Sequence, residues 1–190
     1  MKGMKYHDYI WDLGGTLLDN YETSTAAFVE TLAQFGIEQD HDRVYEALKV
    51  STAYAIEQFA PEIEHFLEKY KENEARELQQ PVLFEGIPAL LEEISNKGGR
   101  HFLVSHRNDQ VLEILKKTAI ADCFTEVVTA NSGFRRKPDP ESLLYLRDKY
   151  QIGSGLVIGD RPIDIEAGRA AGLDTHLFEN VVKLRQVLAI

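Results

Sequence analysis

The sequence contains almost no cysteine and no long apolar segment. Cys123 is the only cysteine among the 190 residues, which excludes an intrachain disulfide framework and a zinc site built from cysteine. No apolar run approaches the roughly 20 residues that a membrane-spanning helix requires. The first five residues also lack the apolar stretch of a secretory signal. We therefore expect a cytoplasmic protein that has no membrane partner.

Positive charge is scarce as well. The chain contains 21 Lys and Arg residues against 31 Asp and Glu residues, a net charge of −10. Because nucleic-acid binding depends on Lys and Arg side chains that neutralise phosphates, this balance indicates no nucleic-acid partner. The negative charge is uneven, however: residues 20–83 carry 13 acidic and 5 basic residues, whereas the rest of the chain has a net charge of only −2. The overall charge therefore does not exclude an anionic ligand outside residues 20–83.

Short apolar runs alternate with segments of helical periodicity over most of the chain. Five runs predict strands, at residues 9–11, 102–104, 127–128, 156–158 and 175–178. Five segments predict helices, over residues 87–97, around 111–115, from 140 onward, over 162–171 and over 180–188. Unbroken apolar strands that alternate with helices favour βαβ units. The pattern predicts an α/β fold with a Rossmann-like parallel sheet of about five strands, covered by helices on both faces.

Residues 20–83 interrupt this alternation, because they contain helical periodicity and no strand candidate. Three helices are predicted there, marked by Phe28, Leu32 and Phe35, by Val44, Ala47 and Leu48, and by Ile63, Phe66, Leu67 and Tyr70. We therefore expect a catalytic core of residues 1–19 and 84–190, with an all-helical insertion, residues 20–83, after the first strand. Trp11 is predicted to lie in the core of the α/β part. The aromatic residues Tyr45, Tyr54 and Phe59 are predicted to lie in the core of the insertion.

The polar residues that follow the predicted strands form a chemically coherent set. In open parallel sheets, ligands bind beyond the carboxyl ends of the strands. The residues at those ends are Asp12 with Gly14-Gly15-Thr16, Ser105-His106-Arg107, Arg135-Arg136-Lys137, and Asp160 with Asp164. A glycine-rich turn exposes N–H donors that can hold a phosphoryl group, while carboxylates in the same site repel that group unless a cation intervenes. Oxygen ligands without cysteine or clustered histidine favour Mg²⁺, so the set predicts metal-assisted phosphoryl chemistry.

Four segments, in this order along the chain, resemble the motifs of the haloacid dehalogenase (HAD) superfamily. They are Asp12 to Asp19 (DLGGTLLD), Ser105 after its apolar strand, Lys137-Pro138-Asp139-Pro140, and Gly159 to Asp164 (GDRPID). The resemblance covers nearly the whole chain, and the helical insertion is similar to the family's C1-type cap. It implies a hydrolase of the phosphatase-like branch that acts on a small phosphorylated metabolite, such as phosphoglycolate or a sugar phosphate. Residues 19–21 and 82–86 would then be the hinges of the cap.

The resemblance also implies roles for individual residues. Asp12 matches the nucleophile, which forms an aspartyl-phosphate that water then hydrolyses. A carboxylate suits this role because its acyl phosphate is labile and splits one difficult step into two easier ones. Thr16, Ser105 and Lys137 match the groups that bind the phosphoryl oxygens. Lys137 also places a compact positive charge where negative charge accumulates in the transition state, and it is therefore a predicted catalytic residue together with Asp12.

A magnesium site follows from the same resemblance. Asp12, the backbone carbonyl of Gly14 and Asp160 match the Mg²⁺ ligands. Asp164 matches the second acid of the last motif, which supports the metal ligands or Lys137. The cation would screen Asp12 from an incoming phosphate dianion and align it for in-line attack.

Gly14 departs from the family's pattern. Most phosphatases of this family carry Asp two residues after the nucleophile, as general acid for the leaving group and base for the attacking water. Losing such a group removes about 10²–10⁴-fold in rate unless another group supplies the proton. Asp19, His106 or a group of the substrate are the candidates for that replacement. A catalytically weakened or inactive phosphate-binding module is therefore one alternative to a phosphatase.

A hydrolase of C–P or C–halogen bonds is another alternative, because such members of the family also lack an acidic residue at this position. The dehalogenase branch works without Mg²⁺, and the presence of Asp160 and Asp164 disfavours it. The phosphonatase branch uses a lysine of the cap as a Schiff-base nucleophile. Lys49, Lys69 and Lys71 are available for that role, although lysines on a solvated helix are common.

Overall fold

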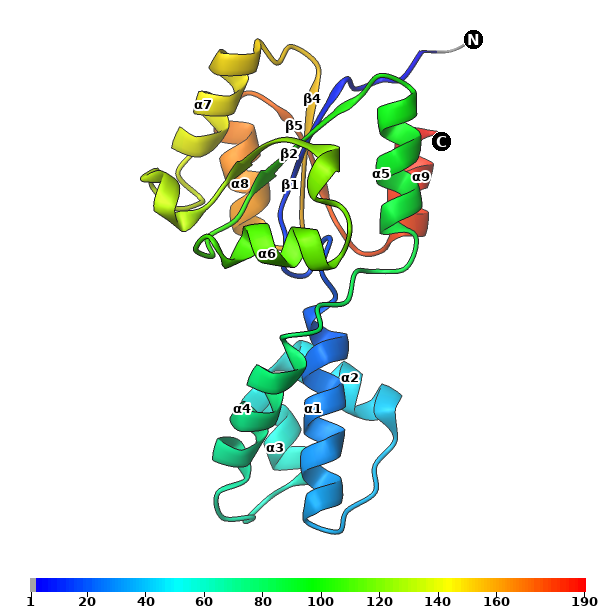
Figure 1. Ribbon diagram of the computed structural model, residues 1–190, viewed down its shortest axis with the longest axis vertical. Coiled ribbons are helices and arrows are strands. Elements are labelled where there is room, and N and C mark those ends of the chain that lie inside the picture. The colour runs from blue at the N-terminus through cyan, green and yellow to red at the C-terminus, as the bar shows by residue number, and fades with distance from the viewer. Residues whose placement is uncertain (1–2) are drawn as a thin grey trace. The chain divides into compact units, whose positions relative to one another are not determined.

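The chain folds into two compact units. The computed structural model describes residues 3–190; Met1 and Lys2, which the predicted catalytic core includes, lie outside the described residues. An α/β unit contains the chain up to Leu18 together with Leu83–Ile190, and a helical unit contains Asp19–Val82. The helical unit therefore begins and ends one residue earlier than the predicted insertion, residues 20–83. Figure 1 labels the helices and strands of both units.

The α/β unit is built on one sheet of five parallel strands. The strands are β1 (Asp8–Trp11), β2 (Arg100–Val104), β3 (Phe124–Val128), β4 (Gly155–Gly159) and β5 (Asp174–Leu177). Their order across the sheet is β3-β2-β1-β4-β5. The central strand β1 pairs with both neighbours, so Ile10 lies opposite Phe102 on one side and opposite Val157 on the other. The predicted α/β fold with a parallel sheet is confirmed.

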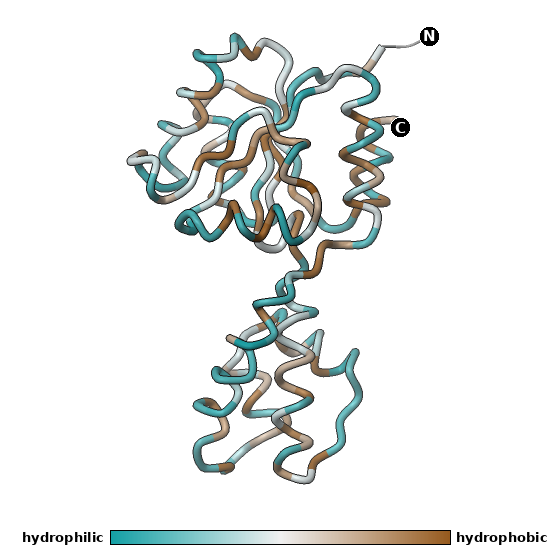
Figure 2. Tube along the Cα trace, in the orientation of Figure 1, coloured by the Kyte–Doolittle hydropathy of each residue, from teal (hydrophilic) through white to brown (hydrophobic). Residues whose placement is uncertain are grey.

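Helices cover both faces of this sheet (Figure 1). They are α5 (Ile87–Asn96), α6 (Gln110–Lys117), α7 (Glu141–Tyr150), α8 (Pro162–Ala170) and α9 (Val181–Leu188). Apolar side chains of α5, α6 and α9 pack on one face, and those of α7 and α8 pack on the other. Because successive side chains of a strand point to opposite faces, Trp11 joins the first cluster and Ile10 the second. Figure 2 shows the hydrophobic residues along the strands.

Trp11 is fully buried, as predicted. Its indole N–H donates to Nδ1 of His101 at 3.0 Å, and Nε2–H of His101 donates to the carbonyl of Leu91 at 3.0 Å. This chain of two hydrogen bonds fixes the tautomer of His101 and satisfies the polar atoms of both rings. Burial lowers the pKa of His101 below its usual value of 6.5, so the ring is neutral at neutral pH.

The helical unit contains four helices, where the sequence predicted three. They are α1 (Asn20–Gln34), α2 (His41–Val50), α3 (Thr52–Phe59) and α4 (Phe66–Glu77). The short helix α3 escaped prediction because it has only eight residues, of which Ala55 is buried and Ile56 and Phe59 are partly buried. The predicted third helix began too early: Glu62 and His65 have positive φ angles of 63° and 61°, and α4 starts after them.

Aromatic rings packed edge to face form the core of the helical unit. Phe28 lies 5.0 Å from Phe66 and 5.2 Å from Tyr70 between ring centroids, and all three side chains are buried. Among the described residues, no helix of either unit is long and apolar enough to cross a membrane.

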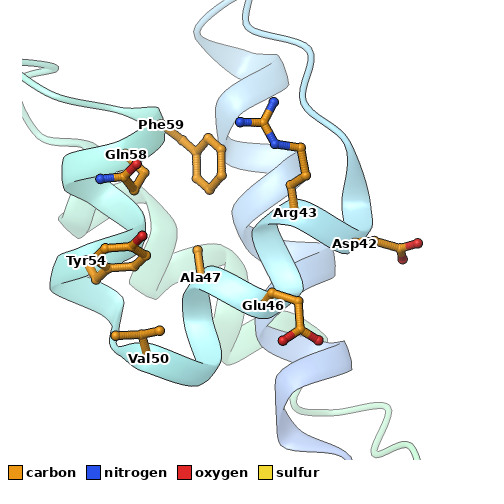
Figure 3. A pocket seen from close by; sticks show the side chains of 8 residues that line it. All are labelled: Asp42, Arg43, Glu46, Ala47, Val50, Tyr54, Gln58 and Phe59. Carbon is orange, nitrogen blue, oxygen red and sulfur yellow. The ribbon is translucent and has the colours of Figure 1, made fainter.

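The three aromatic residues that were predicted to lie in this core behave differently. Phe59 is partly buried against it, and the hydroxyl of half-buried Tyr45 donates to Asp19 at 3.1 Å. Tyr54 is 41% exposed, so the prediction was wrong for this residue. Tyr54 and Phe59 line an open groove of about 590 Å³ between α2 and α3 (Figure 3). The guanidinium of Arg43 lies over the Phe59 ring in this groove, 5.7 Å from its centroid.

Candidate active site

Asp12 follows the central strand of the sheet directly. Its backbone N–H donates to the carbonyl of Ile158 at 2.9 Å, so the β1–β4 pairing continues to this residue. The chain passes from β1 to β2 on one side of β1, and later to β4 on its other side. Ligands of open α/β sheets bind in the crevice where the strand order reverses in this way. The Asp12 side chain is 8% exposed and thus almost enclosed at this position.

The turn after Asp12 brings the end of β1 against the end of β4. Gly15 has a φ of +78°, and a Cβ atom on it would lie 2.2 Å from Oδ2 of Asp160. Only glycine allows both this backbone conformation and this approach. The hydroxyl of fully buried Thr16 donates to Oδ1 of Asp160 at 3.3 Å, and its backbone N–H donates to the carbonyl of Leu13. Both donors of Thr16 therefore have partners within the protein.

Lys137 joins Asp12 and Asp164 through its ammonium group. Nζ lies 3.0 Å from Oδ1 of Asp12 and 2.5 Å from Oδ1 of Asp164, and it also donates to the carbonyl of Val104 at 3.3 Å. The Lys137 side chain is only 3% exposed. A buried ammonium needs such compensation, because an unpaired charge is costly in this environment. Three residues that the sequence predicted to be functional are thus brought together.

Asp164 is held in the first turn of α8. It is 1% exposed, and its Oδ2 accepts a hydrogen bond from the backbone N–H of Arg161 at 3.1 Å. Gly159 makes room for it, since a Cβ atom on that glycine would lie 2.3 Å from the Cβ of Asp164. Because both oxygens have donors, this carboxylate anchors the ammonium of Lys137 to the start of the helix.

The carboxylates of Asp12, Asp160 and Asp164 form a compact cluster. Each contributes an oxygen atom, and these atoms lie within 4.8 Å of one another. Burial, followed by the charge of Asp12, raises the pKa of Asp160 to about 6. Carboxylates this close repel one another, and a divalent cation relieves that repulsion. An oxygen donor set without cysteine or histidine fits Mg²⁺. Within residues 3–190, this is the one grouping of His, Cys, Asp and Glu with such geometry.

The end of β2 contributes Ser105 and His106. Ser105 is 5% exposed, and its Oγ accepts the backbone N–H of Arg107 at 3.2 Å. Nε2 of His106 accepts the backbone N–H of Lys137 at 2.9 Å, which ties the loop after β2 to the loop that carries Lys137. Burial, followed by the positive charge of Lys137, lowers the pKa of His106. From the sequence, His106 was named only as a candidate acid, and this contact was not predicted.

Comparison with known proteins points to one family. The profile of the haloacid dehalogenase-like hydrolases matches residues 9–178. The chain is 32% identical to an N-acetylmuramic acid 6-phosphate phosphatase of Pseudomonas aeruginosa, over 92% of this chain and 82% of the relative. It is 28% identical to a phosphoglycolate phosphatase of Aquifex aeolicus, over 88% and 82%. The crystal structure of a hydrolase from Streptococcus pneumoniae TIGR4 superposes with a TM-score of 0.94 at 81% identity, over 98% of this chain and 100% of that one.

Proposed function

This chain belongs to the haloacid dehalogenase-like hydrolases, and from this premise we propose that it is a Mg²⁺-dependent phosphatase of a small phosphorylated metabolite. One observation carries the proposal. The almost enclosed carboxylate of Asp12 accepts a hydrogen bond from the ammonium of Lys137 at 3.0 Å and belongs to a cluster of acidic oxygens suited to a divalent cation. A carboxylate that is neutralised by an ammonium and by a bound cation can meet a phosphate dianion.

Asp12 acts as the nucleophile. One of its oxygens forms a bond to phosphorus, the bond from phosphorus to the leaving oxygen breaks, and the leaving oxygen keeps the electron pair. Water then attacks phosphorus, the Asp12–phosphorus bond breaks, and inorganic phosphate leaves with the carboxylate restored. Lys137 and the hydroxyl of Ser105 bind the phosphoryl oxygens. Thr16 supports Asp160, because its hydroxyl already donates to that carboxylate.

Asp12, Asp160 and the carbonyl of Gly14 would hold Mg²⁺. The cation supplies, when bound, positive charge beside the phosphoryl oxygens and the attacking carboxylate. Asp164 orients Lys137 instead, because its two oxygens are occupied by the ammonium of that lysine and by the N–H of Arg161.

We propose that the helical unit is the cap and that it selects the substrate. Relatives that cover most of the chain include phosphatases of phosphoglycolate and of N-acetylmuramic acid 6-phosphate. These names support a small phosphorylated metabolite as the substrate class. The connections at residues 19–21 and 82–86 join the two units and are the proposed hinges.

The cap lysines disfavour the phosphonatase alternative. A Schiff-base lysine must lose its proton, which requires burial away from acidic groups or a neighbouring cation. Lys49, Lys69 and Lys71 have side chains that are about half exposed, and each ammonium lies within 3.5 Å of a glutamate on its own helix. These lysines are solvated and paired with glutamates on the surface of their helices and are not enclosed in a site, so we retain the phosphatase as the single proposed function.

The test is a panel of phosphate esters and anhydrides with Mg²⁺, assayed with the natural chain and with Asp12→Asn. We expect turnover that Mg²⁺ chelation removes and that Asp12→Asn abolishes. Asp148→Asn is the matched control, because it makes the same change in an exposed side chain of α7 that pairs with Arg147. Absence of any turnover that depends on Asp12 would contradict the proposal and favour a phosphate-binding module.

A further inference from the structure

A second pocket of the α/β unit adjoins the candidate active site. It has a volume of about 130 Å³ and is lined by the loops that follow β2 and β3 and by the first turn of α7. Ser105 belongs both to this pocket and to the proposed phosphoryl site, and the carbonyl of Val104, another lining residue, accepts a hydrogen bond from Lys137 at 3.3 Å. Neither Asp12 nor Lys137 lines the pocket, so it lies beside the active site and is not part of it.

The wall of this pocket combines apolar side chains with a buried hydroxyl that has no partner. Val104 and Val128 are each 3% exposed, and the ring of Phe134 packs against that of Tyr145 with 4.7 Å between the centroids. Ser142 is 2% exposed, and its Oγ has no hydrogen-bond partner among the described residues. A buried hydroxyl without a partner is costly. We therefore expect a polar atom of a ligand or of water to occupy the pocket beside Ser142.

The start of α7 adds a second donor at the same place. The first N–H groups of a helix have no acceptor within the helix and carry a partial positive charge, so they favour anions. The N–H of Glu141 is already used, since it donates to Oδ1 of Asp139 at 3.0 Å. The N–H of Ser142 has no acceptor within residues 3–190. Ser142 thus offers both its N–H and its hydroxyl.

The charged residues that line the pocket are two arginines. Arg135 already pairs with Asp139 at 3.4 Å and with Glu141 at 3.3 Å. Arg136 is exposed, and its guanidinium has no hydrogen bond or ion pair in the part of the chain that the structure describes. A guanidinium, an N–H and a hydroxyl are the donors that bind the oxygens of a small anion. Arg136 is therefore the cation that is available to a ligand here.

We propose that this pocket is a second oxyanion site, which binds a group of the size of a carboxylate or a sulfate through Arg136 and Ser142. A water molecule takes up about 30 Å³ in the liquid, so about 130 Å³ has room for such a group and not for a nucleotide. Two sources of the oxyanion fit the position next to Ser105. One is a second anionic group of the substrate, which rests on the proposed function, and the other is a free oxyanion, which does not.

Removal of Mg²⁺ distinguishes this pocket from the phosphoryl site. Without a cation, the carboxylates of Asp12, Asp160 and Asp164 lie together and repel an anion, with only the ammonium of Lys137 to oppose them. None of these carboxylates lines the pocket at Ser142. An oxyanion that is added without Mg²⁺ should therefore bind in the pocket and not beside Asp12.

The test is a titration of the ¹⁵N-labelled chain with sodium sulfate, in EDTA and at constant ionic strength, followed by the chemical shifts of the backbone amides. We expect saturable shifts at Ser142 and in the loop of Arg136. Loss of a donor to an anion should weaken sulfate binding about tenfold in Arg136→Gln and about threefold in Ser142→Ala. Arg169→Gln is the matched control, because Arg169 is exposed in the last turn of α8, and it should bind sulfate as the natural chain does.

Turnover identifies the source of the oxyanion. With Mg²⁺, kcat/KM is compared for phosphoglycolate, which carries a carboxylate beside its phosphoryl group, and for ethyl phosphate, which does not. A preference for phosphoglycolate that Arg136→Gln removes assigns the pocket to the substrate. A variant that binds sulfate more weakly but keeps the ratio of the natural chain assigns the pocket to a free oxyanion.

The inference is overturned by a titration without saturable shifts at Ser142, which would mean that the pocket holds only water. Equal affinity of the natural chain and Arg136→Gln for sulfate would overturn it too, as would shifts that centre on Asp12. Because the titration needs no turnover, a chain that binds sulfate in the pocket but hydrolyses neither ester would contradict the proposed function and leave the oxyanion site in place.

Discussion

Replacing Lys137 by methionine should destabilise the fold as well as remove activity. The Lys137 side chain is 3% exposed, and its two carboxylate partners, Asp12 and Asp164, are 8% and 1% exposed. Lys137→Met keeps the apolar stem but leaves both carboxylates without their cation. Removing one partner from a buried ion pair costs about 3–5 kcal/mol. We expect a loss of this size in the free energy of unfolding, measured by urea denaturation without Mg²⁺.

A double-mutant cycle separates the charge effect from lost packing. Asp164→Asn is nearly isosteric and removes one of the two uncompensated charges, so the double variant Lys137→Met/Asp164→Asn should lose less than the sum of the single variants. A coupling of about 1–3 kcal/mol is expected for residues in one network. Lys149→Met is the matched control, because Lys149 pairs with Glu126 at an exposed site. Exposed pairs contribute little to stability.

Two results would refute this reasoning. One is a loss for Lys137→Met no larger than that for Lys149→Met. The other is strict additivity of the two single changes, which would mean that Lys137 and Asp164 contribute independently. Either would show that the buried ammonium does not hold the carboxylates together.

Three further predictions follow from particular contacts. Mg²⁺ should raise the midpoint of thermal unfolding more at pH 7.5 than at pH 5. The Asp160 pKa of about 6 lies between these two pH values, and a protonated carboxyl does not hold the cation. Equal increases of the midpoint at both pH values would contradict the assignment of Asp160 as a ligand. Folding should become less favourable as the pH falls below about 6.5. In the unfolded chain His101 takes up a proton at this pH, whereas buried His101 in the folded chain does not, because burial lowers its pKa. The free energy of unfolding of His101→Gln should therefore fall less steeply from pH 7 to pH 5 than that of the natural chain, and an unchanged slope would exclude His101 as the cause. Gly15→Ala should lower the free energy of unfolding more than Gly36→Ala and should also weaken Mg²⁺ binding, measured by calorimetry. Both glycines have a φ of +78°, but only at Gly15 would the added Cβ meet Asp160. Equal losses of stability would show that backbone strain alone matters, which costs about 1–3 kcal/mol at such a position.

The strands β1, β2 and β4 were predictable because both faces of the sheet are covered and their apolar runs are unbroken. The turn residues that follow them are polar, so strand ends and candidate site residues were found together. The edge strands β3 and β5 contain polar residues and are partly exposed, so only their apolar parts were found. The order of the strands was not predicted, since it depends on which apolar faces pack after the chain has folded. Helix α3 was missed for a different reason: its eight residues are too few for its apolar residues Ala55, Ile56 and Phe59 to establish a helical period.

Some features of the candidate site could likewise be predicted from the sequence, and others could not. Asp12, Lys137 and Asp160 could be singled out because the carboxyl ends of parallel strands converge. The burial of Asp164 was not readable from a position inside a helix, and it depends on the space that Gly159 leaves beside it. The contact between His106 and the N–H of Lys137 joins two loops that are 31 residues apart, which no local pattern encodes.

Asp12 is proposed to carry the phosphoryl group during turnover. The direct test is to mix the protein with Mg²⁺ and acetyl phosphate, quench it in acid, and locate any phosphoryl group by mass spectrometry of the digested chain. We expect one group, on Asp12, that disappears as the substrate is exhausted and is absent from Asp12→Asn. Turnover with the label on another residue, or turnover that persists in Asp12→Asn, would contradict this proposal.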